Sequence, residues 1–302
     1  MRFLLSVIIC THNPKRHYLS KVLESLQFQT LSHDVWELLL IDNASQTPLN
    51  AEIDLSWHPN ARHIREDQLG LTPARLRGIH ESTADTLVFV DDDNILEPDY
   101  LEAALIISKD WAKIGAWSGQ VKPVFEQQPP DWTKLYWTNL AIREFDQDRW
   151  SNLPNHAEAI PCGAGLCMRR AVALKYAEMV KNDPKRAGMD RKGKLLTSGG
   201  DTDMALTACD MGLGMGQFTA LKLHHIMPAQ RLQEDYLLRL EEGLNYSGIV
   251  LRYLRGEVPS VSWSRQAVLF CKRYLMDART RRFHDAAQRG IRLALREIAR
   301  QA

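Results

Sequence analysis

The first hundred residues alternate between two hydrophobic periods, and this alternation constrains the fold more than any other feature of the sequence. Near-continuous apolar runs rich in β-branched residues predict strands that are buried on both faces. Such runs occupy residues 3–10, 36–41, 61–65 and 86–90. Apolar residues at helical spacing predict helices between them, at residues 18–28, 72–81 and 100–108. Alternating strands and helices predict an α/β fold with a mixed, mainly parallel sheet flanked by helices.

The second predicted helix carries recognisable start signals. Thr72 is expected to be its N-cap, with Pro73 at the first helical position.

Composition narrows the class of protein. The chain has 302 residues, of which 45% are apolar and 25% charged, which fits one large globular domain or two and excludes general disorder. With a net charge of +1, the protein has no overall positive field that would attract nucleic acid. No apolar run approaches the ~20 residues that span a bilayer. The five scattered cysteines contain no CxxC pair, so we expect neither a disulfide framework nor a structural zinc site, and a cytoplasmic location.

Polar residues follow the predicted strands at the point where each strand ends. They are Thr11, His12 and Asn13 after the first run, Asp42 after the second, and Asp91, Asp92 and Asp93 after the run at 86–90. Ligands of open parallel sheets bind beyond the carboxyl ends of the strands. We therefore expect one polar edge that carries the function.

The three consecutive acids are the sharpest feature of that edge. Neighbouring carboxylates repel, and Mg²⁺ or Mn²⁺ would compensate them through oxygen ligands. In an extended segment Asp91 and Asp93 face one way and Asp92 the other. The alternative is a solvated acidic turn in which Asp93 or Asn94 caps the next helix. The position directly after a buried strand favours the metal site.

A second acidic cluster lies in Ser198-Gly199-Gly200-Asp201-Thr202-Asp203, where a helix is expected to begin. Paired glycines before it indicate a tight turn that brings backbone close to a ligand. A carboxylate there can act as a general base. A helix N-cap would explain one of the two aspartates equally well.

An ordered set of segments resembles the family 2 glycosyltransferases of the GT-A fold. The segments cover about residues 4–255 and read SVIICTHNP, LLLIDNAS, GLTPARLRGI, LVFVDDDNILEPDYL, GAGLCMRRAVA, SGGDTDMALTACDMG and LHHIMPAQRL. The resemblance implies a GT-A (Rossmann-like) catalytic domain over 1–230, with a nucleotide-binding half (1–110) and an acceptor-binding half (111–230). Residues 231–302 would form a helical, basic C-terminal extension.

The resemblance also implies roles for the residues at the strand ends. Thr11, His12 and Asn13 would meet the nucleotide base and ribose, and Asp42 the base. Asp91-Asp92-Asp93 matches the family's DxD element, in which Asp93 would bind the metal and Asp91 the ribose or a metal-bound water. Arg75 falls in the family's Ala-Arg segment, where it either approaches the diphosphate or is an exposed helix arginine.

The family's catalytic base corresponds to Asp201. That base usually follows a Glu, and Gly200 departs from the pattern, which leaves Asp203 as an alternative base. A late histidine completes the metal site in several GT-A enzymes. His224 and His225 are the candidates, and strand alternation allows only one of them to face the site.

The activity implied is a metal-dependent inverting transfer with Mn²⁺ or Mg²⁺. The donor would be a nucleotide-diphosphate sugar, a UDP-sugar by default, and the acceptor a hydroxyl of a glycan or lipid-linked molecule in bacterial surface polysaccharide synthesis. The alternatives are a non-catalytic sugar-nucleotide-binding protein, a sugar-phosphate nucleotidyltransferase and a phosphatase. The absence of glycine from Thr11-His12-Asn13-Pro14 counts against the nucleotidyltransferase.

Three further segments bear on the acceptor side. Five of the eight tryptophans lie in 111–150; we expect core packing for Trp111 and Trp117 and an acceptor-side role for at least one of the others. Cys162 and Cys167 are expected to be buried thiols. Residues 181–197 read either as a loop that closes over the donor or as a plain surface loop.

The C-terminal segment 261–302 holds ten Lys or Arg and three acids, so it carries +7 while residues 1–260 carry −6. It predicts two amphipathic helices, around 264–280 and 283–300. A basic amphipathic helix either lies on an anionic membrane or packs on the domain or on a second subunit. Peripheral contact with the inner face of the membrane, or a homodimer, is therefore open.

Overall fold

The computed structural model of the chain describes residues 3–190, 196–258 and 273–301. The chain divides into two compact units. Unit 1 comprises Met1–Ala187 and Asp201–Pro228, and unit 2 comprises Gly188–Gly200 and Ala229–Ala302.

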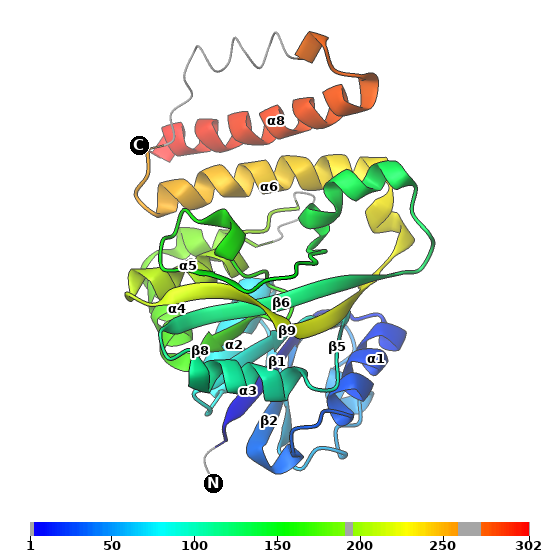
Figure 1. Cartoon of the computed structure of the whole chain (residues 1–302), viewed down its shortest axis with the longest axis vertical. Coiled ribbons are helices and arrows are strands. Elements are labelled where there is room, and N and C mark those ends of the chain that lie inside the picture. Colours follow the sequence, from blue (N-terminus) through cyan, green and yellow to red (C-terminus); the bar gives the residue numbers. More distant parts are fainter. Residues whose placement is uncertain (1–2, 191–195, 259–272, 302) are drawn as a thin grey trace. The chain divides into compact units, whose positions relative to one another are not determined.

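Unit 1 contains a nine-stranded sheet with the order β3-β2-β1-β4-β8-β6-β9-β5, in which β7 also pairs with β9 (Figure 1). The strands are β1 Leu5–Thr11, β2 Trp36–Asn43, β3 Ala61–Glu66, β4 Thr86–Val90, β5 Asn94–Leu96, β6 Ile114–Phe125, β7 Arg149–Ser151, β8 Cys167–Arg169 and β9 Gly214–Met227. The pairs β3-β2, β2-β1, β1-β4 and β6-β9 are parallel and the others antiparallel. The predicted α/β class with a mixed sheet is confirmed.

Helices connect these strands, and the helices predicted at 18–28, 72–81 and 100–108 are present with starts that differ by at most two residues. The α-helices of this part are α1 Arg16–Gln27, α2 Leu71–Glu81, α3 Tyr100–Asp110, α4 Arg170–Asn182 and α5 Gly200–Asp210. Short 3₁₀ helices lie at His33–Val35, Leu49–Ala51, Asp131–Leu140, Ala157–Ala159, Pro184–Gly188 and, in unit 2, Ala229–Leu232. The prediction of Thr72 as an N-cap is wrong, because α2 starts at Leu71 and its N-cap is Gly70. The φ of +141° at Gly70 disfavours any side chain there.

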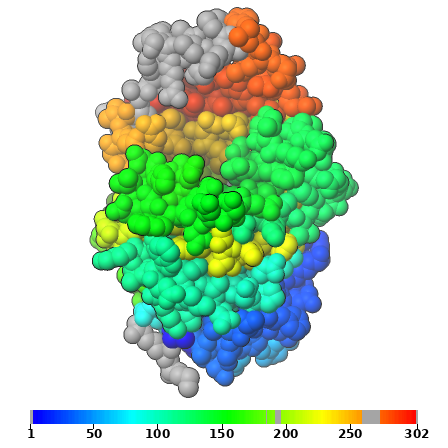
Figure 2. Space-filling model, in the orientation of Figure 1, coloured from blue at the N-terminus to red at the C-terminus, as the bar shows by residue number. Residues whose placement is uncertain are grey.

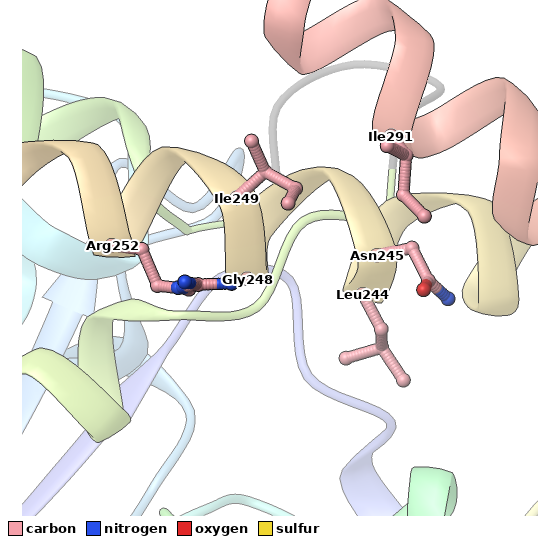
Figure 3. Close-up of a pocket in the computed structure, with 6 residues that line it drawn as sticks. All are labelled: Leu244, Asn245, Gly248, Ile249, Arg252 and Ile291. Carbon is pink, nitrogen blue, oxygen red and sulfur yellow. The ribbon is translucent and has the colours of Figure 1, made fainter. Parts of the chain in front are cut away.

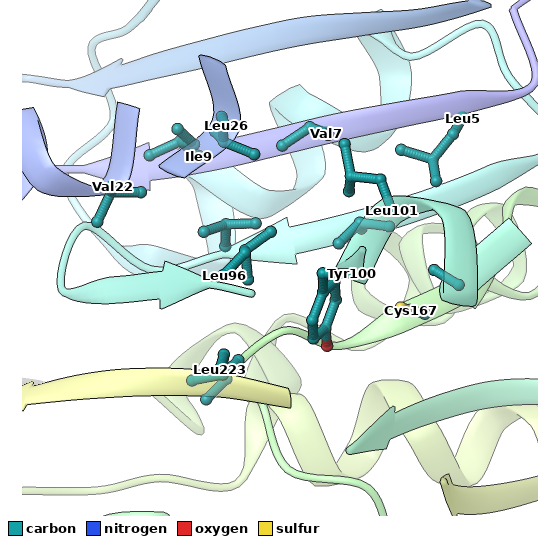
Figure 4. Close-up of a cluster of buried hydrophobic side chains, with 14 of the residues drawn as sticks. Leu5, Val7, Ile9, Val22, Leu26, Leu96, Tyr100, Leu101, Cys167 and Leu223 are labelled. Atoms are coloured by element: carbon teal, nitrogen blue, oxygen red, sulfur yellow. The ribbon is translucent and has the colours of Figure 1, made fainter. Parts of the chain in front are cut away.

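The central strands are buried on both faces, as their continuous apolar runs predicted. Leu5, Val7 and Ile9 of β1 join one apolar cluster with α1 and α3, part of which Figure 4 shows. Ile8 points to the other face and joins a second cluster with residues of α2, α4 and α5. Because helices cover both faces, the edges beyond the strand ends are left for ligands. The early part of the described chain, blue in Figure 2, lies on the surface of unit 1.

Unit 2 is built on two long helices, α6 Glu234–Leu254 and α8 Ala278–Gln301, which lie side by side (Figure 1). They approach closely at Gly290, where an added Cβ would lie 2.1 Å from the carbonyl oxygen of Glu242. The predicted helix at 283–300 is present and begins five residues earlier. The predicted helix at 264–280 falls largely outside the described residues. No helix in the described ranges has the length and apolarity needed to cross a membrane.

Candidate functional site

Three parallel strands of unit 1 deliver their polar ends to one edge of the sheet. The β1-β2 register pairs Thr11 with Asp42, and the β1-β4 register pairs Ile9 with Val90, so the residues after β4 follow on beside Thr11. The Thr11 hydroxyl donates a short hydrogen bond to Oδ2 of Asp92. The sheet therefore brings Thr11 and the acidic segment together as the sequence predicted.

The turn after β1 is fixed by the turn after β2. Nδ1 of His12 lies 2.7 Å from the carbonyl oxygen of Asn43. Asn13 adopts φ +47°, and its backbone N–H donates to Oγ of Ser45 at 3.0 Å. His12 and Asn13 are themselves exposed, so their outer edges are available to a ligand.

The carboxylate of Asp42 accepts several hydrogen bonds from the protein. Its donors include the backbone N–H groups of Ser45 and Leu49, both at 3.1 Å, and Nη1 of Arg65 at 2.7 Å. Burial opposes ionisation, but the bonds from Ser45, Leu49 and Arg65 outweigh it and lower the pKa of Asp42. Asp42 thus holds the loop after β2 in place at this edge.

Two partners in this region gave no signal in the sequence. Arg65, at the end of β3, is the cation that pairs with Asp42. The side chain of Asn43 accepts from the N–H of Gly70 at 2.8 Å and donates to the carbonyl oxygens of Glu66 and Gln68. Only the parallel β2-β3 register brings these residues together.

The acidic segment does not cap a helix. Asn94 begins β5, and the N-cap of α3 is Asp99, so the alternative in which Asp93 or Asn94 caps the next helix is wrong. Asp93 is only 7% exposed. The antiparallel pairing of β5 with β9 sets Asn94 opposite His225, and Nε2 of His225 lies 3.4 Å from Oδ2 of Asp93. His224 lies elsewhere, with Nε2 at 2.7 Å from Oε1 of Glu97. The structure therefore brings His225 to the acidic segment and not His224.

Asp91 lies close to several other charged side chains. Burial and then the neighbouring charge of Asp93 raise the pKa of Asp91 to about 6, and the charges of Arg75 and His225 act in the opposite direction. Arg75 is 6% exposed on α2, so it is not an exposed helix arginine. Arg75 thus belongs to the same electrostatic cluster as Asp91.

The donor set at this edge fits a divalent cation that also binds substrate. Within the ranges that the structure describes, no three or more His, Cys, Asp or Glu side chains are arranged to hold a metal ion by themselves. Asp93 and His225 are nonetheless adjacent, and Mg²⁺ or Mn²⁺ commonly takes one or two protein ligands and completes its shell with phosphates and waters. Burial is the larger cause of the raised pKa of Asp91, and the repulsion from Asp93 that adds to it is what a cation would relieve.

Asp201 lies in the first turn of α5, and its carboxylate is held by backbone. The N–H of Gly163 donates to Oδ2 at 3.0 Å and the N–H of Thr202 to Oδ1 at 2.8 Å. A Cβ at position 163 would lie 2.6 Å from Oδ2, so this approach requires glycine. Asp201 remains partly exposed.

Asp203 is in a different environment. It is fully buried, and Nη1 of Arg186 lies 2.8 Å and 2.6 Å from its two carboxylate oxygens. A carboxylate held this way is poorly placed to take a proton from a substrate. Arg186 belongs to the 181–197 segment, which is not one loop: α4 runs to Asn182, a 3₁₀ helix follows, and residues 191–195 lie outside the described ranges.

The sequence departs from the family pattern at Gly200, and the space beside this glycine is occupied by the carboxylate of Asp190, which also belongs to unit 2. A Cβ at Gly200 would lie 2.6 Å from both carboxylate oxygens of Asp190, which is 7% exposed. A larger side chain at position 200 would have to displace that carboxylate.

The aromatic and cysteine predictions have mixed outcomes. Trp117 is fully buried, whereas Trp111 is 36% exposed and contacts Phe218 and the exposed Trp150. Core packing is thus confirmed for Trp117 and is wrong for Trp111. Cys162 and Cys167 are buried free thiols, and burial raises the pKa of both.

Known proteins match this chain in sequence and in fold. The archaeal glucosyl-dolichyl phosphate glucuronosyltransferase of Haloferax volcanii is 24% identical over 138 residues, 44% of each protein. A crystal structure of S. aureus TarS superposes with a TM-score of 0.54 at 15% identity, over 93% of this chain and 44% of that one. A crystal structure of GalNAc-T7 with UDP, GalNAc and Mn²⁺ superposes with a TM-score of 0.57 at 16% identity, over 99% of this chain and 57% of that one.

The chain spans less than half the length of the curated relatives that it matches. The structural matches establish a shared GT-A fold. Residues 6–172, more than half of the chain, match the glycosyl transferase family 2, and this segment contains all but the first residue of β1, the whole of β2 and β4, and the acidic segment after β4. The chain therefore belongs to glycosyl transferase family 2.

Proposed function

We propose that the protein is a metal-dependent inverting glycosyltransferase that moves a sugar from a nucleotide-diphosphate donor to a hydroxyl group. The observation that carries the proposal is the grouping of Asp91, Asp93, His225 and Arg75 at the edge where β1, β2 and β4 end. Family membership and the shared fold support it.

Residues 1–110 would bind the nucleotide. Thr11, His12 and Asn13 would meet the base and ribose, and Asp42, held ionised by its own bonds, would accept a hydrogen bond from the base. Asp91 and Asp92 would lie along the ribose and diphosphate. Arg75 would offset the charge of the diphosphate.

Asp93 and His225 would hold Mn²⁺ or Mg²⁺. When bound, the cation would neutralise charge that develops on the departing diphosphate. His224, which lies against Glu97, has no part in this proposal as a ligand. UDP is the default nucleotide, supported by the UDP and Mn²⁺ in the GalNAc-T7 structure that shares the fold.

Residues 111–230 would bind the acceptor, a glycan or a lipid-linked molecule of a bacterial surface polysaccharide pathway. Asp201 would take the proton from the acceptor hydroxyl as its oxygen attacks the anomeric carbon and the bond to the diphosphate breaks. One displacement from the opposite face inverts the anomeric configuration. Residues 231–302 would form the helical extension.

The test is a thermal-shift screen of nucleoside diphosphates and their sugars, with Mn²⁺ and with a chelator. A ligand that binds only the folded state raises the melting temperature. A metal-dependent rise with one nucleotide, followed by sugar transfer or slow donor hydrolysis, is the expected result. Metal-dependent binding without turnover would favour a non-catalytic sugar-nucleotide-binding protein, and no shift with any nucleotide would overturn the proposal.

A further inference from the structure

Only some of the arginines of the basic C-terminal helix α8 form ion pairs within unit 2. In its N-terminal half, three arginines pair with acids of α6. Nε of Arg279 and Nη1 of Arg282 lie 3.5 Å and 2.9 Å from the carboxylate of Glu234, and Nε of Arg289 lies 2.9 Å from Oε2 of Glu242. These pairs, with the close approach at Gly290, fix which face of α8 packs on α6.

The C-terminal half of α8 is different. Arg292, Arg296 and Arg300 recur every four residues, so they share one face of the helix. All three are exposed, and none forms a hydrogen bond or ion pair with any residue in the described ranges. The one acid of this half, Glu297, is turned to α6, where the hydroxyl of Tyr246 donates to it at 2.6 Å.

Apolar surface lies beside these arginines. Leu293 is 43% exposed on the same face. Ile291 lies on the other side of the helix, about 140° from Arg296 and about 180° from Arg300, and lines a groove of about 390 Å³ with Leu244, Ile249 and Arg252 of α6. In Figure 3 the side chain of Ile291 points from α8 towards α6, which supplies the other lining residues.

We propose that the face of α8 bearing Arg292, Leu293, Arg296 and Arg300 (the arginine face) binds an anionic phospholipid surface. Guanidinium groups pair with lipid phosphates, and an exposed leucine among them can enter the headgroup boundary. A nucleic acid would satisfy the charges but not the exposed leucine. A second copy of the same face would meet like charge.

The test measures sedimentation of the full chain with vesicles of phosphatidylcholine alone and with vesicles that also contain phosphatidylglycerol. We expect binding only to the anionic vesicles, and a decline as salt is raised. Replacing the three arginines with glutamine (Arg292→Gln, Arg296→Gln, Arg300→Gln) keeps helix propensity and should lower the partition coefficient on the order of 100-fold.

A matched control removes three exposed lysines of unit 1, through Lys21→Gln, Lys109→Gln and Lys113→Gln. The change in net charge is the same, so binding should fall less than about threefold if the arginine face is the contact. Melting temperatures of both variants check that the fold is kept. Leu293→Gln tests the apolar part and should weaken binding while leaving its salt dependence in place.

Five outcomes overturn the proposal. Equal binding to both kinds of vesicle would show that charge has no role. An equal loss of vesicle binding in the lysine variant would show that net charge, and not the arginine face, controls binding. Full competition by inorganic phosphate points to a soluble anion, and binding to an oligonucleotide but not to vesicles points to nucleic acid. A dimer in solution that only the arginine variant dissociates, without vesicle binding, assigns the face to self-association.

Discussion

The backbone N–H of Gly163 donates a 3.0 Å hydrogen bond to Oδ2 of Asp201, across 38 positions of sequence. The contact joins the small-residue segment before β8 to the first turn of α5. It fixes one carboxylate oxygen and leaves the partly exposed group able to reach a substrate. The sequence around either residue does not reveal this contact. Glycine is favoured at position 163 because the Asp201 carboxylate approaches it closely, and not because the backbone forms a turn there.

Asp201→Asn tests the proposed role of Asp201 as the general base. The amide keeps the shape of the side chain but cannot take a proton, so transfer should fall by about 10²- to 10⁴-fold. Donor and metal affinity and the melting temperature should stay near those of the wild type. Near-normal turnover in this variant would assign the proton to another group.

Gly163→Ala tests the positioning of that base without touching its chemistry. The added Cβ would lie 2.6 Å from Oδ2, so the carboxylate must move away from the backbone N–H. We expect kcat to fall at least about tenfold, since small misplacements of a reacting group are costly, while nucleotide binding is kept. Gly188→Ala is a matched control, because a Cβ there meets nothing within 4 Å. Equal losses in both variants would reject a specific role for Gly163.

The pair of Arg186 and Asp203 is predicted to be structural. Asp203 is fully buried and held by two contacts from one guanidinium, so Arg186→Met should lower the unfolding free energy by about 3–5 kcal/mol. Adding Asp203→Leu should recover most of that loss, because an apolar pair leaves no buried charge. Denaturant unfolding measures both. If the double variant is stable but inactive, Asp203 has a role beyond the ion pair.

The sequence predicted much of the nucleotide-binding half, and the reasons are local. Continuous apolar runs located β1, β2, β3 and β4 within one or two residues, and their polar ends predicted the edge at which the structure groups Thr11, Asp42 and the acidic segment. The choice between His224 and His225 could not be made in this way, because it depends on the register of β9 against β5.

The strands and long-range contacts of the second half of the chain could not be predicted from the sequence, for physical reasons. β7 and β8 are three residues long and carry no period, and β6 is interrupted by polar residues and register shifts. Arg65 with Asp42 and Arg186 with Asp203 are contacts between residues distant in sequence, which composition and spacing do not encode. Thr72 failed as an N-cap because Gly70, at φ +141°, ends the preceding turn earlier.

His225→Ala and His224→Ala should separate the two neighbouring histidines. Only His225 lies beside Asp93, so its loss should weaken the Mn²⁺ dependence of nucleotide binding by at least about tenfold. His224→Ala removes a contact with Glu97 and should leave metal affinity unchanged. Titration of Mn²⁺ at fixed nucleotide gives both values, and a larger effect from His224 would contradict the placement.

Asp91 should make the metal-free protein less stable as the pH rises. Its pKa is raised to about 6 in the folded protein, chiefly by burial and the charge of Asp93, from an ordinary value of 3.8. Between these two values the folded state binds more protons than the unfolded state, so the unfolding free energy falls as the pH increases from about 4 through 6.

Asp91→Asn removes that dependence, because an amide carries no charge at any pH. The variant should be more stable than the wild type at pH 7 in the presence of a chelator, by up to about 2 kcal/mol, and the difference should shrink towards pH 4. Asp110→Asn, on the exposed end of α3, is the control and should not alter the pH profile. Urea unfolding at a series of pH values measures the difference. If the Asp91→Asn variant shows the same pH profile as the wild type, the Asp91 carboxyl does not have a raised pKa in solution. That result would weaken the case for a cation beside it.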